Sequence, residues 1–88
     1  MKLKTGVILT KMQDETVAVA VGEAGSVFKG MIKMNETAAF LAEHLQNEQT
    51  EDGLVSLLLS EYRVSEEDAR RNVRYVVAQL TKIGLIDQ

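Results

Sequence analysis

The sequence predicts an α+β fold in which a three-stranded antiparallel sheet is followed by three helices, in the order β-β-β-α-α-α. β-Branched and apolar residues dominate the chain up to Met34, whereas beyond Asn35 the apolar residues recur every three or four positions. Two short breaks, at residues 13–15 and 22–25, divide the first part into strands that are joined closely enough to form a meander. A chain of 88 residues forms one domain, which we expect to span residues 1–88.

The three strands are predicted from their composition. Residues 7–12 are rich in apolar and β-branched side chains, which favour a pleated, half-buried surface. Residues 16–21 place three valines on one face and two alanines on the other, and this period of two indicates a strand with one buried face. After a turn at residues 22–25, which contains two glycines, we expect the third strand at residues 26–33.

Each predicted helix begins after a residue whose side chain can accept a backbone N–H hydrogen bond. Asn35 precedes a helix over residues 36–46, Thr50 precedes the second helix, and Ser65 precedes the third. The third helix ends at Gly84, in the manner of a C′ glycine. The second and third helices are separated by so short a turn that, with the small sheet, the architecture resembles a winged helix-turn-helix.

Composition excludes several kinds of protein. The sequence contains no cysteine, which rules out disulfides, thiolate metal sites and a cysteine nucleophile. The first residues lack the apolar core of a signal peptide, and no apolar run approaches a membrane span, so we expect a soluble cytoplasmic protein without membrane contacts. The net charge of −3 disfavours non-specific binding of nucleic acid.

No arrangement of residues indicates catalysis. His44 is the one histidine, so a single chain cannot form a two-histidine metal site, and we interpret His44 as a partly exposed surface residue. The acids at residues 66–68 complement the positive end of the third helix dipole. We therefore expect neither an enzyme nor a protein that binds a metal or a cofactor.

Arg70, Arg71 and Arg74 form a basic cluster on the third helix. In a transcriptional regulator of winged-helix type they would face DNA, but the acids at the start of the same helix would then face phosphates. The plain alternative is pairing within the helix, of Glu66 with Arg70 and of Glu67 with Arg70 or Arg71.

The third strand is an edge of the predicted sheet, with unpaired backbone N–H and C=O groups. Lys29 and Lys33 are its only charged residues, and Gly30 allows close approach of another backbone. Such an edge accepts another strand, is covered by the third helix, or pairs with the same edge of a second copy. Its apolar residues are Val27, Phe28, Met31 and Ile32.

Two segments carry a resemblance to a known family. Met-Asn-Glu-Thr-Ala-Ala-Phe-Leu at residues 34–41 and Leu-Thr-Lys-Ile-Gly-Leu-Ile at residues 80–86 resemble the PqqD-like family of small peptide chaperones, and the similarity extends over residues 7–86. The resemblance implies a winged helix-turn-helix without catalytic activity. It also implies binding of the leader of a ribosomally made precursor peptide, which is then presented to a radical SAM or other peptide-modifying enzyme.

The resemblance further implies that the leader adds to the third strand, in a groove between that strand and the third helix. Basic residues in this groove would suit an acidic leader. No nucleic acid is expected as a partner, and the chain is expected to be a monomer or a weak homodimer. The residues that we expect to line the groove are Val27, Phe28, Lys29, Gly30, Met31, Ile32, Arg70, Val73, Arg74 and Val77.

Overall fold

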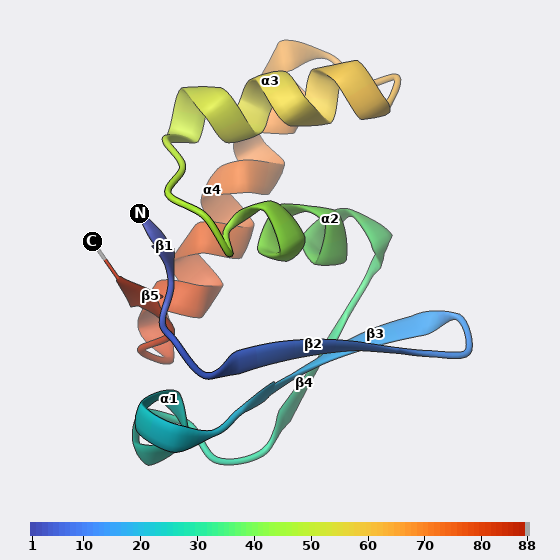
Figure 1. Cartoon of the computed structure of the whole chain (residues 1–88). Helices are drawn as coiled ribbons and strands as arrows, with labels where there is room; N and C mark the ends of the chain where they lie inside the picture. The colour runs from blue at the N-terminus through green and yellow to red at the C-terminus, as the bar shows by residue number, and fades with distance from the viewer. Residues whose placement is uncertain (88) are drawn as a thin grey trace.

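The computed structural model describes residues 1–87, with the side chain of Val27 left out, and has the predicted α+β architecture (Figure 1). The predicted order β-β-β-α-α-α is wrong, because a short helix precedes the last strand of the sheet and a short strand lies at each end of the chain. The elements are β1 (Lys2–Leu3), β2 (Val7–Met12), β3 (Glu15–Ala20), α1 (Gly22–Val27), β4 (Met31–Met34), α2 (Glu36–His44), α3 (Glu51–Glu61), α4 (Glu66–Lys82) and β5 (Ile86–Asp87).

The three-stranded antiparallel sheet is confirmed, with the strand order β2-β3-β4. A tight turn joins β2 to β3, where Met12 pairs with Glu15, and Gln13 adopts a positive φ of 57°. In the middle of the sheet Ala18 pairs with Leu9 on one side and with Ile32 on the other. Because β3 is paired on both sides, β2 and β4 are the two edges of the sheet.

The predicted third strand at residues 26–33 is only partly present. Residues 22–27 form α1 where a turn was expected, and the strand begins only at Met31. Ala24 of α1 is fully buried in the core. Packing of this helix therefore outweighs the β propensity that predicted a strand from residue 26 onward. Gly30, with a φ of 130°, then turns the chain into β4.

A second, two-stranded sheet joins the two ends of the described chain. Lys2 of β1 pairs with Asp87 of β5, and Leu3 pairs with Ile86. Leu3 is buried, and its N–H donates to the carbonyl of Leu45 at 2.7 Å. The sequence did not predict this sheet, because strands of two residues are too short to show a periodicity.

All three predicted N-caps are confirmed. The side-chain oxygen of Asn35 accepts from the N–H of Ala38 at 2.8 Å, and Thr50 and Ser65 accept in the same way at 3.0 and 3.1 Å. The first of these helices ends at His44, two residues before the predicted end. Gly84 has a φ of 81°, which fits the predicted C′ position.

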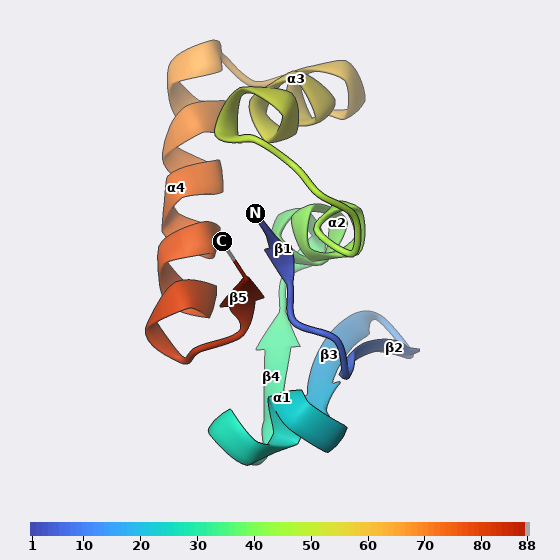
Figure 2. The ribbon, with the colours of Figure 1, turned by 60° about the vertical axis from the view of Figure 1, so that its left-hand side comes forward.

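The core lies where α4 packs against α3, α2 and the β1–β5 sheet (Figure 2). The stripe of α4 that faces it consists of Ala69, Val73, Val76 and Leu80, which are all buried. On α3, Leu54, Val55 and Leu58 are buried, whereas Leu59 is 38% exposed. No helix within residues 1–87 is long and apolar enough to cross a membrane.

The two faces of the three-stranded sheet have different neighbours. The face that carries Ala18 packs against the helices, together with Leu9, Ile32 and Met34. The valines of β3 point to the other face, which is the outer face of the sheet. The predicted alternation of burial along this strand is not found, because Val17 on the outer face is 5% exposed and Ala18 on the inner face is 1% exposed.

Candidate functional site

The outer edge of β4 is an unpaired strand edge. β4 pairs with β3 through four residues, from Met31 to Met34, and within residues 1–87 no strand pairs with its other edge. Figure 2 shows β4 between β3 on one side and α4 on the other. Every second backbone N–H and C=O of β4 therefore points away from β3 and toward the side on which α4 lies.

A hollow of about 240 Å³ separates β4 from α4. Its floor is formed by core residues, and the ring of Tyr75, which is 65% exposed, stands at its border on α4. Lys33 is the one charged residue in its lining, and its side chain starts from the outer face of the sheet, opposite Val17. The full lining is Ile32, Lys33, Met34, Asn35, Ala38, Tyr75, Val76, Gln79 and Leu80.

The opposite flank of α4 is closed by ion pairs with α3. The guanidinium of Arg70 donates to Glu51 at 2.7 Å, to Asp52 at 2.9 Å and to Glu66 at 3.4 Å. Arg74 donates to the other carboxylate oxygen of Glu51 at 3.1 Å. The hydrogen bonds from Arg74 and then from Arg70 hold the pKa of Glu51 below its usual value.

The predicted pairing within the helix is confirmed. Arg70 pairs with Glu66, and Arg71 pairs with Glu67 at 3.3 Å and with Asp68 at 2.7 Å. The additional pairs from Arg70 to α3 were not predicted, because the sequence does not show which flank of α4 the second helix covers. All three arginines of the cluster therefore have acidic partners inside the protein.

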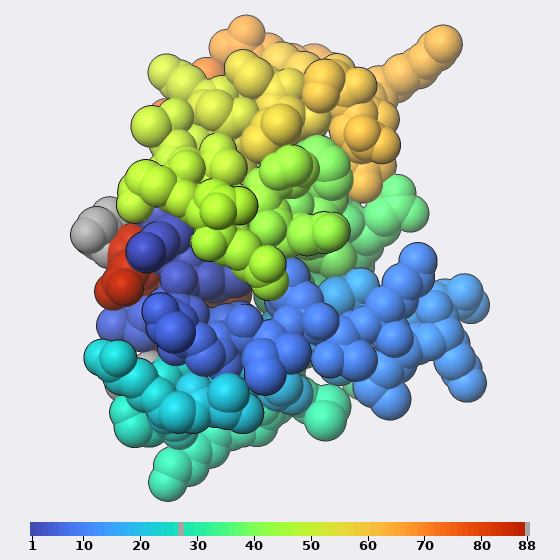
Figure 3. All heavy atoms as spheres, viewed as in Figure 1, coloured from blue at the N-terminus to red at the C-terminus, as the bar shows by residue number. Residues whose placement is uncertain are grey.

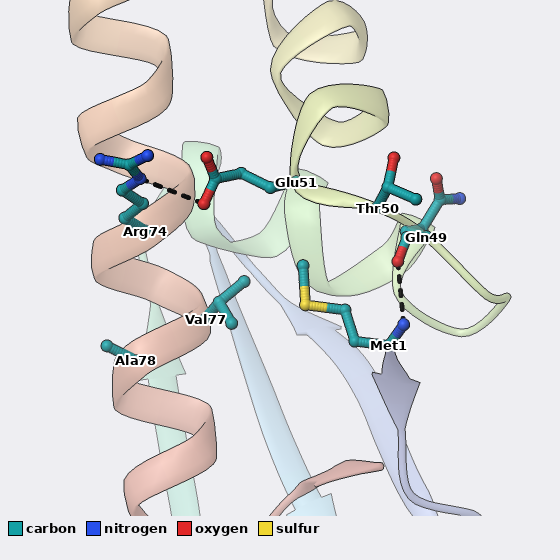
Figure 4. Close-up of a pocket in the computed structure, with 7 residues that line it drawn as sticks. All are labelled: Met1, Gln49, Thr50, Glu51, Arg74, Val77 and Ala78. Carbon is teal, nitrogen blue, oxygen red and sulfur yellow. Dashed lines mark hydrogen bonds and ion pairs between the residues drawn. The ribbon is translucent and has the colours of Figure 1, made fainter. Parts of the chain in front are cut away.

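A second hollow, of about 480 Å³, lies beside the Arg74–Glu51 pair (Figure 4). Val77 and Ala78 of α4 form one wall, and the thioether of Met1 points between them and Glu51. The amino group of Met1 donates to the carbonyl oxygen of Gln49 at 2.9 Å. This hollow is separate from the one at β4, since the two have no lining residue in common.

The residues that the sequence placed in one groove are thus distributed over several parts of the molecule. Ile32 lines the hollow beside β4, while Met31 points to the outer face of the sheet and is 61% exposed. Phe28, Lys29 and Gly30 precede the strand, with Phe28 half-buried and the other two exposed. Val27 ends α1, and its side chain lies outside the described part of the structure.

The predicted residues of the third helix do not line the β4 hollow. Val73 is fully buried in the core, and Arg74 and Val77 line the hollow on the other flank. Sequence reasoning missed Tyr75 and Gln79, which do face β4. An exposed aromatic residue that lies off the buried stripe of a helix is a usable signal, because exposed aromatics are enriched where partners bind.

His44 is half-buried, as predicted, and its ring lies 4.7 Å from that of Phe40 in an edge-on arrangement. Phe40 also meets the ring of Tyr62 at 5.6 Å. Burial, followed by the nearby carboxylate of Glu36, raises the pKa of Tyr62. Across the described residues no three His, Asp or Glu side chains are grouped so that they could hold a metal ion.

Comparison with known proteins gives one family and two similar structures. The family model described as Coenzyme PQQ synthesis protein D (PqqD) matches residues 10–86. The structure of TbiB1 in complex with the TbiA(beta) leader peptide is similar, with a TM-score of 0.77 at 17% identity, over 99% of this chain and 95% of that chain. Lasso peptide synthetase B1 complexed with the leader peptide has a TM-score of 0.73 at 21% identity, over 96% and 93% of the two chains. No curated protein matches the chain at a significant level.

Proposed function

The chain belongs to the PqqD family, and we propose that it binds the leader segment of a ribosomally synthesised precursor peptide without catalysing a reaction itself. The observation that carries this proposal is the unpaired edge of β4 beside the hollow that α4 borders. A peptide that adds to a strand edge gains affinity from main-chain hydrogen bonds and selectivity from its alternate side chains.

In the proposed complex the leader extends the sheet as an antiparallel strand next to β4. Alternate leader side chains enter the hollow and contact Ile32 of β4 and Tyr75 and Gln79 of α4. The apolar floor favours an aliphatic or aromatic leader residue at this point, since burial of apolar surface gives about 25 cal/mol per Å². The two similar structures, which are described as complexes with leader peptides, support binding of a leader peptide by this fold.

The charge of the proposed site is smaller than the sequence predicted. Arg70 and Arg74 are neutralised by the acids of α3, so they are not free to bind an acidic leader. Lys33, at the border of the hollow, and Lys29, before β4, remain as cations near the β4 edge. We propose that an acidic leader residue pairs with Lys33, and that apolar contacts supply most of the affinity.

Presentation of the bound leader to a radical SAM or other peptide-modifying enzyme is part of the same proposal. A strand held at the edge of the sheet leaves the remainder of the precursor free, because the β4 site is only four residues long. We place this function in the cytoplasm.

The alternative of a DNA-binding regulator is not favoured. We interpret α3, α4 and the small sheet as a winged helix-turn-helix arrangement, yet the cations that would contact phosphates are engaged elsewhere. Arg70, Arg71 and Arg74 all form ion pairs with carboxylates of α3 or α4. Phosphate binding would require these pairs to break, and it would bring phosphates close to the acids at the start of α4.

A titration followed by amide NMR tests the proposed function. A synthetic peptide with the sequence of a candidate precursor leader is added to labelled protein, and we expect chemical-shift changes in β4 and around Tyr75 and Gln79. The N–H groups near Arg70 and Glu51 serve as an internal control and are expected to stay unchanged. Saturable shifts confined to this control flank would contradict the proposal.

A further inference from the structure

The outer edge of β2 is the second unpaired edge of the three-stranded sheet. β2 pairs with β3 through all six of its residues, and within residues 1–87 no strand pairs with its other edge. α2 packs mainly over β3 and β4, and in Figure 3 the blue atoms of β2 lie uncovered along the projecting hairpin. Lys11 is the one charged residue of β2, and the strand contains neither a proline nor a bulge. Such an edge readily accepts a further strand.

The hydrogen-bond pattern identifies the backbone groups on this edge. The N–H of Val21 donates to the carbonyl of Gly6 at 2.8 Å, and the pairing of β2 with β3 continues from these two residues. Because bonded pairs alternate along an antiparallel ladder, every second residue from Gly6 onward exchanges bonds with β3. The residues between them direct their N–H and C=O groups to the free edge. These residues are Val7, Leu9 and Lys11.

We propose that β2 of a second copy of this chain adds to the edge as an antiparallel strand, so that two sheets join into one of six strands. A two-fold axis perpendicular to the sheet passes between the two Thr10 residues. Leu9 then lies opposite Lys11 of the other copy and exchanges main-chain hydrogen bonds with it. On the other face of the sheet Ile8 lies opposite Met12 of the other copy. Each copy contributes the same surface, as an isologous dimer requires.

This register covers exposed apolar side chains. Ile8 is 47% and Met12 56% exposed, and both lie on the outer face of the sheet, where they pair with Val19 and Glu15 of β3. Between the two copies, Ile8 meets Met12 twice and the two Thr10 side chains meet at the axis. Cross-strand pairs of apolar residues and of threonines stabilise an antiparallel sheet.

Charge complementarity supports a second copy as the partner. Lys11 lines a hollow of about 360 Å³ between β2 and α2, which Leu9 and Glu43 also line. Among the described residues, neither Lys11 nor Glu43 forms an ion pair. In the proposed register Lys11 of the other copy lies opposite Leu9, at the mouth of this hollow. The two hollows then join, and the joined hollow holds two lysines and two glutamates, so that each cation has an anion nearby.

Other registers are less favourable. A shift of one residue would align the inner face of one copy with the outer face of the other. A shift of two residues in one direction would set Lys11 directly opposite Lys11. The same shift in the other direction would set Lys11 opposite Val7, which lies in one hollow with Lys2 and Lys4. Only the register with Thr10 at the axis keeps like charges from lying opposite each other or beside further lysines.

This dimer differs from the pairing of last-strand edges considered from the sequence. The outer edge of β4 stays free at both ends of the six-stranded sheet, so the inference is independent of the proposed function. The association is reversible, so Lys11 and Glu43 are paired only in the dimer and not in the dilute monomer.

Sedimentation equilibrium over a series of protein concentrations tests the proposal. We expect a monomer–dimer equilibrium for the natural chain and a dissociation constant about tenfold higher for Lys11→Glu, because the joined hollow then holds four acids. Lys11→Glu combined with Glu43→Lys again gives two charges of each sign and should return the dissociation constant toward the natural value. Lys29→Glu, at an exposed lysine before β4, makes the same change of charge and is the control.

Circular dichroism verifies that each variant is folded. A natural chain that stays monomeric would overturn the proposal. A double variant that associates no better than Lys11→Glu would also overturn it, because the charges would then not meet across the axis.

Oxidation of single-cysteine variants tests the register. The chain has no cysteine, so Thr10→Cys and Ile8→Cys each introduce one thiol. At the axis the two Thr10 positions form a non-hydrogen-bonded pair with Cα atoms about 4.5 Å apart, which suits a disulfide. The two Ile8 positions are four residues apart along the strands, or roughly 14 Å. We expect a disulfide-linked dimer of Thr10→Cys and little of Ile8→Cys. Faster linkage of Ile8→Cys would overturn the proposed register.

Discussion

The two flanks of α4 lie at similar angles from its buried stripe, but one flank contacts α3 and the other borders the hollow beside β4. At about 100° per residue, Arg70 and Arg74 lie roughly 90–130° to one side of the stripe, and Tyr75 and Gln79 lie as far to the other side. The arginine flank is held against α3 by ion pairs. The tyrosine flank borders the hollow next to the unpaired edge of β4.

This difference shows that a cluster of charge in a sequence does not by itself mark a binding surface. The arginines are the more conspicuous feature, yet their guanidinium groups are used within the protein to hold α3 against α4. The other flank, with Tyr75 and Gln79, borders the unpaired edge of β4, where we propose that the leader binds through main-chain hydrogen bonds and apolar contacts. Five experiments test this contrast, and the one with the largest expected effect comes first.

Proline substitution in β4 separates the two edges of the strand. Ile32→Pro and Lys33→Pro each remove one N–H, and in an antiparallel pair neighbouring N–H groups point to opposite sides. We expect one variant to lose the sheet, and the other to fold but to bind a leader peptide about tenfold or more weakly. Circular dichroism and fluorescence anisotropy measure the two effects. Equal unfolding of both variants would contradict a free β4 edge.

Truncation of neighbouring residues of α4 separates the core from the open flank. Val73→Ala leaves a cavity at a fully buried site and should lower the free energy of unfolding by about 1–3 kcal/mol, with little change in leader affinity. Tyr75→Ala should change stability by less than about 0.5 kcal/mol and weaken binding severalfold. Urea denaturation and calorimetric titration provide the two measurements. If Val73→Ala instead weakened leader binding with little loss of stability, and Tyr75→Ala did the opposite, Val73 would belong to the binding surface.

Removal of the charge of Lys33, the one charged residue that borders the hollow, tests the electrostatic part of the proposal. Lys33→Gln should weaken binding of an acidic leader a few-fold and make the affinity less dependent on salt, because an exposed pair is screened at about 10 Å in 0.1 M salt. Lys11→Gln, at an exposed lysine of β2 on the opposite edge of the sheet, is the control. If both variants keep the salt dependence of the natural chain, apolar contacts alone account for the affinity.

Neutralisation of the arginine flank should affect stability and spare binding. Arg70→Gln and Arg74→Gln remove pairs with Glu51, and we expect a lower urea midpoint for each variant, with a smaller decrease than for Val73→Ala. Leader affinity should change by less than about twofold, since neither side chain borders the β4 hollow. A loss of binding without a loss of stability would place the leader on the arginine flank.

Acid should weaken this same flank. The pKa of Glu51 is lower in the folded chain than its ordinary value of 4.5, so its contribution to stability is present above pH 4.5 and is lost as the pH falls through the lower, folded value. Glu51→Gln should therefore show a smaller loss of stability between neutral pH and acid than the natural chain, measured by urea midpoints. Glu43→Gln, at an exposed glutamate of α2, is the control. An unchanged pH dependence in Glu51→Gln would contradict the assigned role of its carboxylate.

Local features of the fold could be predicted from the sequence, because they depend on residues close together in the chain. The first strand at residues 7–12, the caps Asn35, Thr50 and Ser65, and the buried stripe of α4 all follow from side-chain type and spacing. The likeness to the PqqD-like family was visible in two short segments, and the family match over residues 10–86 confirms it.

The candidate site could be predicted only in part. The free edge of the last strand of the sheet was expected and is present, although the strand begins at Met31. The residues opposite it could not be assigned, because a helical period identifies the buried stripe of α4 and leaves open which neighbour lies on each flank.

The tertiary structure alone decided the remaining features. Residues 22–27 have the composition of a turn and the start of a strand, yet they form a helix because Ala24 is buried in the core. Leu3 pairs with Ile86, although the two residues are distant in the chain. The helices cover the alanine face of β3 and leave the row of Ile8, Val19 and Met31 on the outside. Each of these outcomes depends on contacts between distant segments, whose free energies exceed the local preferences that a sequence pattern records.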